Sequence, residues 1–239
     1  MKKRVLSFVL ALCFVLTLLP AAFADSAPTS GTCGDNLTWR LNGSVLTISG
    51  KGEMDHYASW NKAPWTSYTG RIITVVIEPG VTSIGDWAFI NCSNLKSVSI
   101  PDGLTTIDSM AFDECTRLET ITIPDTVTHI DGYTFRLCSA LKYIELPSGI
   151  TSIDYGTFEG CGNLKSISIP YGVISFESVA FKNCGRMKSI TIPATVTSFG
   201  TNVFEGCSAL KDIYYSGTEE QWEEVKEEME LIHTALKRY

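Results

Sequence analysis

A repeat of 23 residues constrains this chain more than any other feature of its sequence. Phenylalanine and cysteine each recur at this spacing, three residues apart in every copy. The positions are Phe89, Phe112, Phe135, Phe158, Phe181 and Phe204, and Cys92, Cys115, Cys138, Cys161, Cys184 and Cys207. Six full copies fill residues 69–206 without a gap, and a partial copy continues to residue 215. Such an array predicts a solenoid whose coils contact only their neighbours.

One copy of the repeat predicts the shape of a coil. Val98 and Ile100 alternate with polar residues, as in a half-buried strand, and Leu95 precedes them. Pro101 ends this strand because it has no N–H to donate, and an Asp-Gly turn follows. A second apolar pair then leads to a short turn before the next cysteine, which we expect to be a single helical turn. One coil cannot bury these apolar columns alone, but stacked coils about 4.8 Å apart can.

Residues 33–68 are predicted to cap the first coil, since an open solenoid end exposes strand edges. Two alternating segments flank Asn42-Gly43, which is a strong hairpin signal. Trp39, Trp60 and Trp65 are expected to pack as apolar bulk against the first coil. The alternative is that these three rings form an aromatic platform for carbohydrate.

Residues 216–239 are predicted to form a capping helix at the other end. Thr218 and Gln221 have the spacing of a capping box. The residues that follow at helical spacing give one apolar face: Trp222, Val225, Met229, Ile232 and Leu236. Its polar face is rich in glutamate, whereas a membrane-surface helix is rich in lysine. We therefore expect the helix to cover the solenoid or to meet a partner.

The first 24 residues have the layout of a secretory signal peptide. A basic start (1–4) precedes an apolar run (5–19) and an Ala-Phe-Ala pattern at 22–24. The run is short for a membrane span, although an uncleaved anchor is the alternative. Residues 25–32 are expected to be a short linker. Removal of the signal leaves 16 basic against 26 acidic residues, a net charge of −10. This balance argues against a nucleic-acid partner, which would need a basic face.

The repeat unit AFxxCxxLxxVxIPxxVxxI, at residues 88–107, closely resembles the BspA-type leucine-rich repeat of bacterial secreted and cell-surface proteins. Preceding segments resemble the region that often leads into these repeats: GTCGDNLTW (31–39), LTISGKGEM (46–54) and APW (63–65). YYSGTEEQW (214–222) resembles the usual exit, although the acidic run after it departs from the pattern. The resemblance implies a right-handed leucine-rich repeat solenoid, mainly β with short helical turns. It also implies a secreted or cell-surface location and, by analogy, adhesion.

Three hypotheses apply to the cysteine column: metal ligands, disulfides or free thiols. Metal motifs need ligands a few residues apart, and none of these cysteines has such a neighbour. In-register cysteines on adjacent coils lie within disulfide reach, but parallel Cβ bonds aim their sulfurs poorly. We expect free thiols that point inward and pack as small apolar groups. Whether Cys33 is free or paired stays open.

Two further sets of residues were weighed for chemistry. Asp108, Asp131, Asp154 and Glu177 share one position of the repeat, where calcium could bridge them or where they could splay into solvent. The three histidines are isolated, and no hydrolase, zinc-protease or phosphate-loop motif occurs. We expect no enzyme activity, no cofactor and no bound metal.

The outward positions of the predicted strands are the remaining candidate. Most hold serine or threonine, which are ordinary strand formers, and lysines beside them discourage edge pairing. One copy breaks this pattern with an aromatic and an acid, and the predicted binding residues surround it: Glu119, Lys142, Tyr143, Glu145 and Lys165. We predict a monomeric module that recognises a protein or a glycan at a cell surface. The alternative is a structural spacer or envelope component without a specific ligand.

Overall fold

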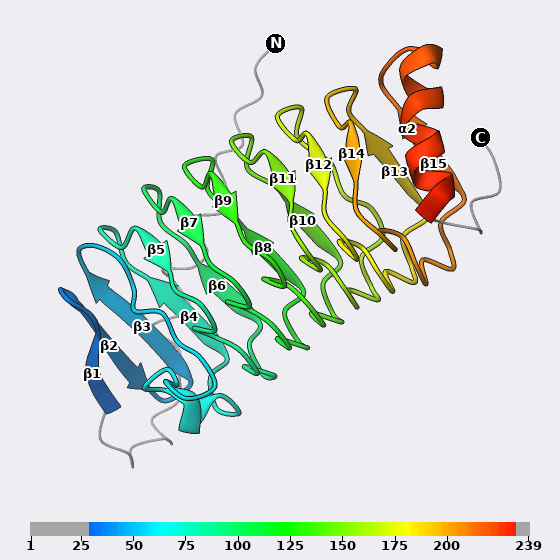
Figure 1. The fold of residues 1–239 in the computed structure, drawn as a ribbon. Helices are drawn as coiled ribbons and strands as arrows, with labels where there is room; N and C mark the ends of the chain where they lie inside the picture. Colours follow the sequence, from blue (N-terminus) through cyan, green and yellow to red (C-terminus); the bar gives the residue numbers. More distant parts are fainter. Residues whose placement is uncertain (1–28, 233–239) are drawn as a thin grey trace, which may run out of the picture.

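The solenoid is built from two rows of short parallel strands (Figure 1). The computed structural model describes residues 29–232, with side chains described through residue 226. The predicted signal peptide and residues 233–239 lie outside this range. Within it, no helix is long and apolar enough to cross a membrane.

The first row follows the apolar alternation of each repeat. Its strands are β3 (Val45–Gly50), β4 (Thr74–Ile77), β6 (Ser97–Ser99), β8 (Thr120–Thr122), β10 (Tyr143–Glu145), β13 (Ser189–Ile192) and β15 (Asp212–Tyr215). Hydrogen-bonded ladders join β3 to β4, β4 to β6, β8 to β10, and β13 to β15. Ser168 links the last two pairs by parallel bridges to Glu145 and Thr191. Partners lie 23 residues apart within the repeats, as stacked coils require.

The second row holds the other apolar pair of each repeat. Its strands are β5 (Ser83–Ile84), β7 (Thr106–Ile107), β9 (His129–Ile130), β11 (Ser152–Ile153), β12 (Ser175–Phe176) and β14 (Ser198–Phe199). They pair in register as β5-β7-β9 and β11-β12-β14. Each coil contributes one strand to each row, so it is hydrogen-bonded to its neighbours on two sides. This explains why strands as short as those of the second row are stable.

The segment before each cysteine differs from the expected helical turn. It consists of overlapping tight turns, in which the N–H of Ala88 bonds the carbonyl of Gly85 and that of Ile90 bonds Trp87. The alternate N–H groups, including that of Phe89, donate instead to carbonyls of the next coil. Two residues per coil take a left-handed backbone, such as Trp87 (φ 58°) and Asn91 (φ 60°). A helix cannot continue through left-handed residues, and bonding between coils compensates the local strain.

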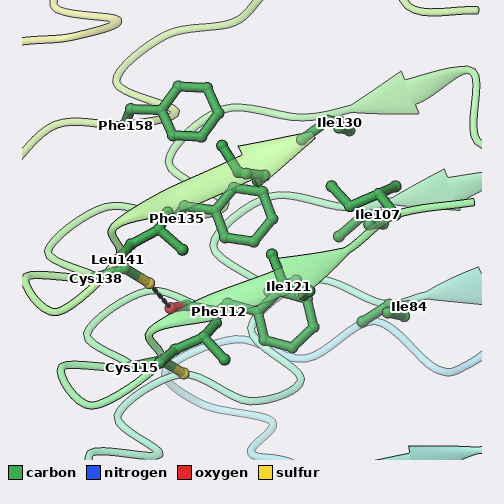
Figure 2. Close-up of a cluster of buried hydrophobic side chains, with 14 of the residues drawn as sticks. Ile84, Ile107, Phe112, Cys115, Ile121, Ile130, Phe135, Cys138, Leu141 and Phe158 are labelled. Atoms are coloured by element: carbon green, nitrogen blue, oxygen red, sulfur yellow. Dashed lines mark hydrogen bonds between the residues drawn. The ribbon is translucent and has the colours of Figure 1, made fainter. Parts of the chain in front are cut away.

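The core contains a continuous aromatic column. Successive phenylalanine rings from Phe89 to Phe204 lie 5.4–5.7 Å apart with planes within 21° of parallel. Trp65 extends this column by one ring, 5.7 Å from Phe89, and its indole N–H donates to the Ala88 carbonyl at 2.7 Å. Figure 2 shows Phe112, Phe135 and Phe158 stacked in the centre of the solenoid, between the cysteines and the isoleucines. Offset stacking adds about 0.5–1.5 kcal/mol per pair to the gain from burial.

The N-terminal cap is larger than predicted. β2 (Leu37–Asn42) and β3 form the expected antiparallel hairpin around Asn42-Gly43. The prediction of a linker at residues 25–32 is partly wrong, because residues 29–32 belong to β1 (Thr29–Gly34), which pairs antiparallel with β2. Its polar residues carry no apolar alternation, so the open edge of β2, and not the pattern of β1, determines the pairing. A 3₁₀ turn, η2 (Thr66–Tyr68), leads into the first coil.

The C-terminal cap is the helix α2 (Glu219–Ile232). The predicted capping box is confirmed: the N–H of Thr218 donates to Oε1 of Gln221 at 2.9 Å, and the N–H of Gln221 donates to Oγ1 of Thr218 at 3.2 Å. Val225 is buried and Trp222 lies against Tyr215, with ring centroids 5.6 Å apart. Figure 1 shows α2 at the end of the coil stack opposite β1 and β2.

Candidate functional site

The outer face of the first strand row is the surface on which the predicted binding residues lie. In β8 and β10 the central residues Ile121 and Ile144 are buried, whereas the residues on either side of each are exposed. The inward residue fixes the strand against the core, so the outward side chains project from a rigid backbone. The structure thus gives this face one pair of outward positions per coil.

Tyr143 is the large aromatic at the centre of this face. Its side chain is 53% exposed, and its backbone pairs with Thr120 on the preceding coil. Glu145 is also exposed and pairs with Thr122 in β8 and Ser168 in the following coil. The two side chains therefore share one face, with the buried Ile144 between them.

Glu119 and Lys142 are joined across adjacent coils. Nζ of Lys142 donates to Oε2 of Glu119 at 2.6 Å, and the Lys142 N–H donates to the Glu119 carbonyl at 3.0 Å. The hydrogen bond and charge of Lys142, with a smaller contribution from Lys96, lower the pKa of Glu119. Both side chains are exposed, so the pair orients its members more than it stabilises the fold.

The structure places all five predicted residues on three neighbouring coils. Lys165 is exposed, one coil after Lys142. Within the part of the chain that the structure describes, only Glu119 and Lys142 of the five form an ion pair with each other. Tyr143 and Glu145 lie on the coil of Lys142 and Lys165 lies on the next coil, all three with side chains open to solvent.

The last coil presents a second aromatic and acid pair that the sequence reasoning did not single out. Tyr214 is 58% exposed on β15, and Asp212 is exposed two residues before it. These residues occupy the repeat positions of Glu145 and Tyr143, with the residue types exchanged. Comparing the partial copy with the full copies would have revealed this pair.

The three tryptophans do not form a carbohydrate platform. Trp39 and Trp65 are buried and meet edge to face at 5.8 Å, as the core-packing interpretation requires. The prediction was wrong for Trp60, which is 88% exposed and does not pack on the first coil. One exposed ring cannot provide the several stacked faces that such a platform needs.

The thiols of the cysteine column are free and buried, as expected. All seven described cysteines are unpaired, Cys33 among them. The thiols of Cys115 to Cys207 donate to the phenylalanine carbonyl of the preceding coil at 3.0–3.3 Å, and Figure 2 shows this contact for Cys138. Burial raises the pKa of Cys92 and of Cys33 to about 12. Thiols held protonated are poor nucleophiles and poor metal ligands.

The acidic column lies at the start of the tight turns, and its first member, Asp108, lies beside His56 of the N-terminal cap. Nδ1 of His56 is 2.9 Å from Oδ2 of Asp86 and 3.5 Å from Oδ2 of Asp108. Burial raises the pKa of Asp108 to about 6, with His56 opposing the rise and neighbouring Asp86 and Asp131 adding to it. Across residues 29–232, no group of three His, Cys, Asp or Glu side chains is placed to hold a metal ion.

Comparison with known proteins agrees with this geometry. The family model of the BspA type leucine-rich repeat region matches residues 67–185 and 140–228, with six copies. None of the curated proteins matches this sequence.

Solved structures of bacterial leucine-rich repeat proteins match this chain. A leucine-rich repeat protein of T. pallidum is 25% identical, with a TM-score of 0.59 over 88% of this chain and 95% of that one. A leucine-rich cell surface protein of Faecalibacterium prausnitzii is 18% identical, with a TM-score of 0.45 over 84% and 98%. A leucine-rich repeat protein of Eubacterium ventriosum is 21% identical, with a TM-score of 0.41 over 80% and 73%.

Proposed function

The chain belongs to the BspA-type leucine-rich repeat family, and on that premise we propose that it is a secreted or cell-surface binding module of an adhesin-like kind. A leucine-rich repeat solenoid is typically a non-catalytic interaction scaffold. The proposed partner is a protein or a glycan at a cell surface. The protein binds it as a monomer from which the signal peptide has been removed.

The exposed Tyr143 carries this proposal. An aromatic ring that remains 53% exposed on a rigid strand gains free energy when a partner covers it, and its hydroxyl can still hydrogen-bond. The Lys142–Glu119 pair and the exposed Glu145 and Lys165 surround the ring with both signs of charge. A central aromatic within a polar rim is the usual arrangement of an interaction hot spot.

The test begins with the mature protein on matrix-protein and glycan arrays, followed by calorimetric titration of each partner found. We expect the double variant Tyr143→Ala/Glu145→Ala to weaken binding by about 2 kcal/mol, the usual size of a hot-spot effect. Both side chains point outward, so the fold should be unchanged by circular dichroism.

The matched control is Tyr171→Ala/Glu177→Ala, which removes the same two residue types from exposed positions outside the first strand row. This control should bind as wild type does. Equal affinity for wild type and the Tyr143 double variant would contradict the proposed site. Absence of any saturable partner would instead favour the structural spacer.

A further inference from the structure

One edge of the solenoid carries a row of exposed lysines, which we call the lysine ridge. They occupy the position just before the first-row strand in successive coils: Lys96, Lys142, Lys165, Lys188 and Lys211. Glu119 is the acidic member of the same row. A chain whose net charge is −7 therefore concentrates positive charge along one line.

Backbone hydrogen bonds fix the spacing of the ridge. The N–H of Lys188 donates to the Lys165 carbonyl at 3.3 Å, and the N–H of Lys211 donates to the Lys188 carbonyl at 3.0 Å. These three lysines thus lie one coil apart, about 4.8 Å along the solenoid axis. The spacing is shorter than the Debye length of about 8 Å at physiological salt, so the three charges act together on an approaching ion.

The ridge is neutralised at one end only. Glu119 pairs with Lys142 at 2.6 Å in the N-terminal part. Among the residues that the structure describes, no carboxylate lies within 4.0 Å of the ammonium group of Lys165, Lys188 or Lys211. The charge of this stretch therefore remains available to a ligand.

Arg186 adds to the unpaired stretch. It is exposed two residues before Lys188, at the position that Arg117 occupies in an earlier coil. Asp212 is the acid nearest to this stretch along the chain, directly after Lys211. The stretch from Lys165 to Lys211 thus carries four basic groups, and one acid stands directly beside them in the sequence.

The shape and chemistry of the ridge select among anionic partners. Single-stranded nucleic acid needs aromatic side chains on which its bases stack, and no aromatic residue stands beside a ridge lysine from Lys165 to Lys211; the nearest along the chain is Tyr214, three residues after Lys211. A protein partner would need a buried apolar anchor, which this edge lacks. A linear polymer with one anionic group per sugar residue matches a row with one cation per coil, and Ser166 and Ser189 lie beside the lysines to hydrogen-bond sugar hydroxyls.

We propose that the lysine ridge from Lys165 to Lys211, with Arg186, binds a linear acidic polysaccharide through its repeating carboxylate or sulfate groups. This site goes beyond the Tyr143 surface and shares only Lys165 with it. Substitution of Arg186, Lys188 and Lys211 leaves all five residues of that surface in place, so the two proposals can fail separately.

The experiment measures binding of polygalacturonate and of heparin to the mature protein by biolayer interferometry at several salt concentrations. We expect both polymers to bind wild type, with affinity that falls steeply as salt rises because counterions are released on binding. The variant Arg186→Gln/Lys188→Gln/Lys211→Gln should lose at least tenfold in affinity and show a flatter salt dependence. Tighter binding of polygalacturonate would indicate a preference for carboxylate groups, and tighter binding of heparin a preference for sulfate groups.

The matched control is Arg40→Gln/Lys51→Gln/Lys62→Gln, which removes three exposed basic groups from the N-terminal cap. This variant has the same net charge as the ridge variant and should bind within twofold of wild type. Lys188→Arg/Lys211→Arg keeps the charge and should also retain binding. Circular dichroism checks that every variant is folded.

Three results would overturn the proposal. The first is an equal loss in the control variant, which would mean that net charge and not the ridge attracts the polymer. The second is binding of neutral dextran as tightly as polygalacturonate or heparin, or no binding of either acidic polymer. The third is tighter binding of oligo(dT), which would identify the partner as a nucleic acid.

Discussion

The two ends of the solenoid are closed by caps of different kinds. At the N-terminal end, β3 pairs with β4 over four residues, and Trp65 stacks on Phe89. At the C-terminal end, α2 covers the last coil, with Val225 as its buried residue among the described side chains. The N-terminal cap continues both the backbone ladder and the aromatic column. The C-terminal helix makes its backbone hydrogen bonds within itself and contributes little to the core.

This difference predicts how tightly each cap is coupled to the coils. Loss of packing in the N-terminal cap breaks a column that runs through every repeat. Loss of packing under α2 releases one helix and uncovers β14 and the ring of Tyr215 in the last coil. We therefore expect the N-terminal cap to unfold with the solenoid and α2 to detach before it.

The largest effect is expected for Trp65→Ala, at about 3–5 kcal/mol of unfolding free energy. This change removes the first ring of the column and leaves the Ala88 carbonyl without its 2.7 Å donor. Chemical denaturation measures it, with Phe135→Ala as the benchmark for a ring in a middle coil. Trp60→Ala is the control and should change little, because that ring is 88% exposed. A Trp65 variant as stable as the Trp60 variant would show that the cap is not part of the column.

Val225→Ala tests the other cap and should cost about 1.5 kcal/mol, from two methyl groups at about 0.8 kcal/mol each. The loss should be local, because α2 can separate while the coils stay paired. Limited proteolysis should therefore cut the variant within α2 and leave a stable fragment. A fully cooperative loss of the solenoid in this variant would mean that both caps are equally coupled.

Thr218→Ala should cost about 1 kcal/mol, the usual effect of an N-cap. It removes the oxygen that accepts from the Gln221 N–H at 3.2 Å. Helix content measured by circular dichroism should fall before the sheet signal does. Thr197→Ala, at an exposed position directly before β14, should leave both signals unchanged.

Thiol reactivity compares the two ends of the solenoid in the wild-type protein. Burial raises the pKa of Cys92 to about 12 and holds the pKa values of Cys115 and Cys138 well above their ordinary range. At pH 8 these groups stay protonated in the folded protein, and their thiolate fraction grows about tenfold per pH unit up to the folded pKa. Cys207, 9% exposed in the last coil, should react first with a thiol reagent.

Denaturant should expose all seven described cysteines to the reagent. Mass spectrometry of the labelled protein assigns the order. Uniform labelling of the native protein, or disulfides between coils, would contradict the buried column.

Much of the fold follows from local pattern and repetition. The 23-residue period requires stacked coils, since one coil cannot bury its own apolar columns. Phe135 and Cys138 were predicted to point inward for this reason, and both are buried. The hairpin at Asn42-Gly43 and the Thr218–Gln221 capping box were also readable, because each depends on residues a few positions apart. The candidate binding residues share one surface because a period of 23 brings equal positions together.

The sequence by itself determined the coil, the inward columns and the two capping signals. The tertiary structure decided the features that depend on contacts between coils. Trp60 and Trp65 are the same residue type five positions apart, and only contacts with residues distant in the sequence, Trp39 and Phe89, make Trp65 a core ring. Asp113 is buried with Arg136, which donates to it at 2.6 and 3.0 Å from the next coil, and the burial of this carboxylate depends on the stacking of the two coils. Two residues in the tight turns before each cysteine are left-handed, and in the coils that have a following coil the alternate N–H groups of these turns bond it; no residue pattern within one repeat specifies that bond.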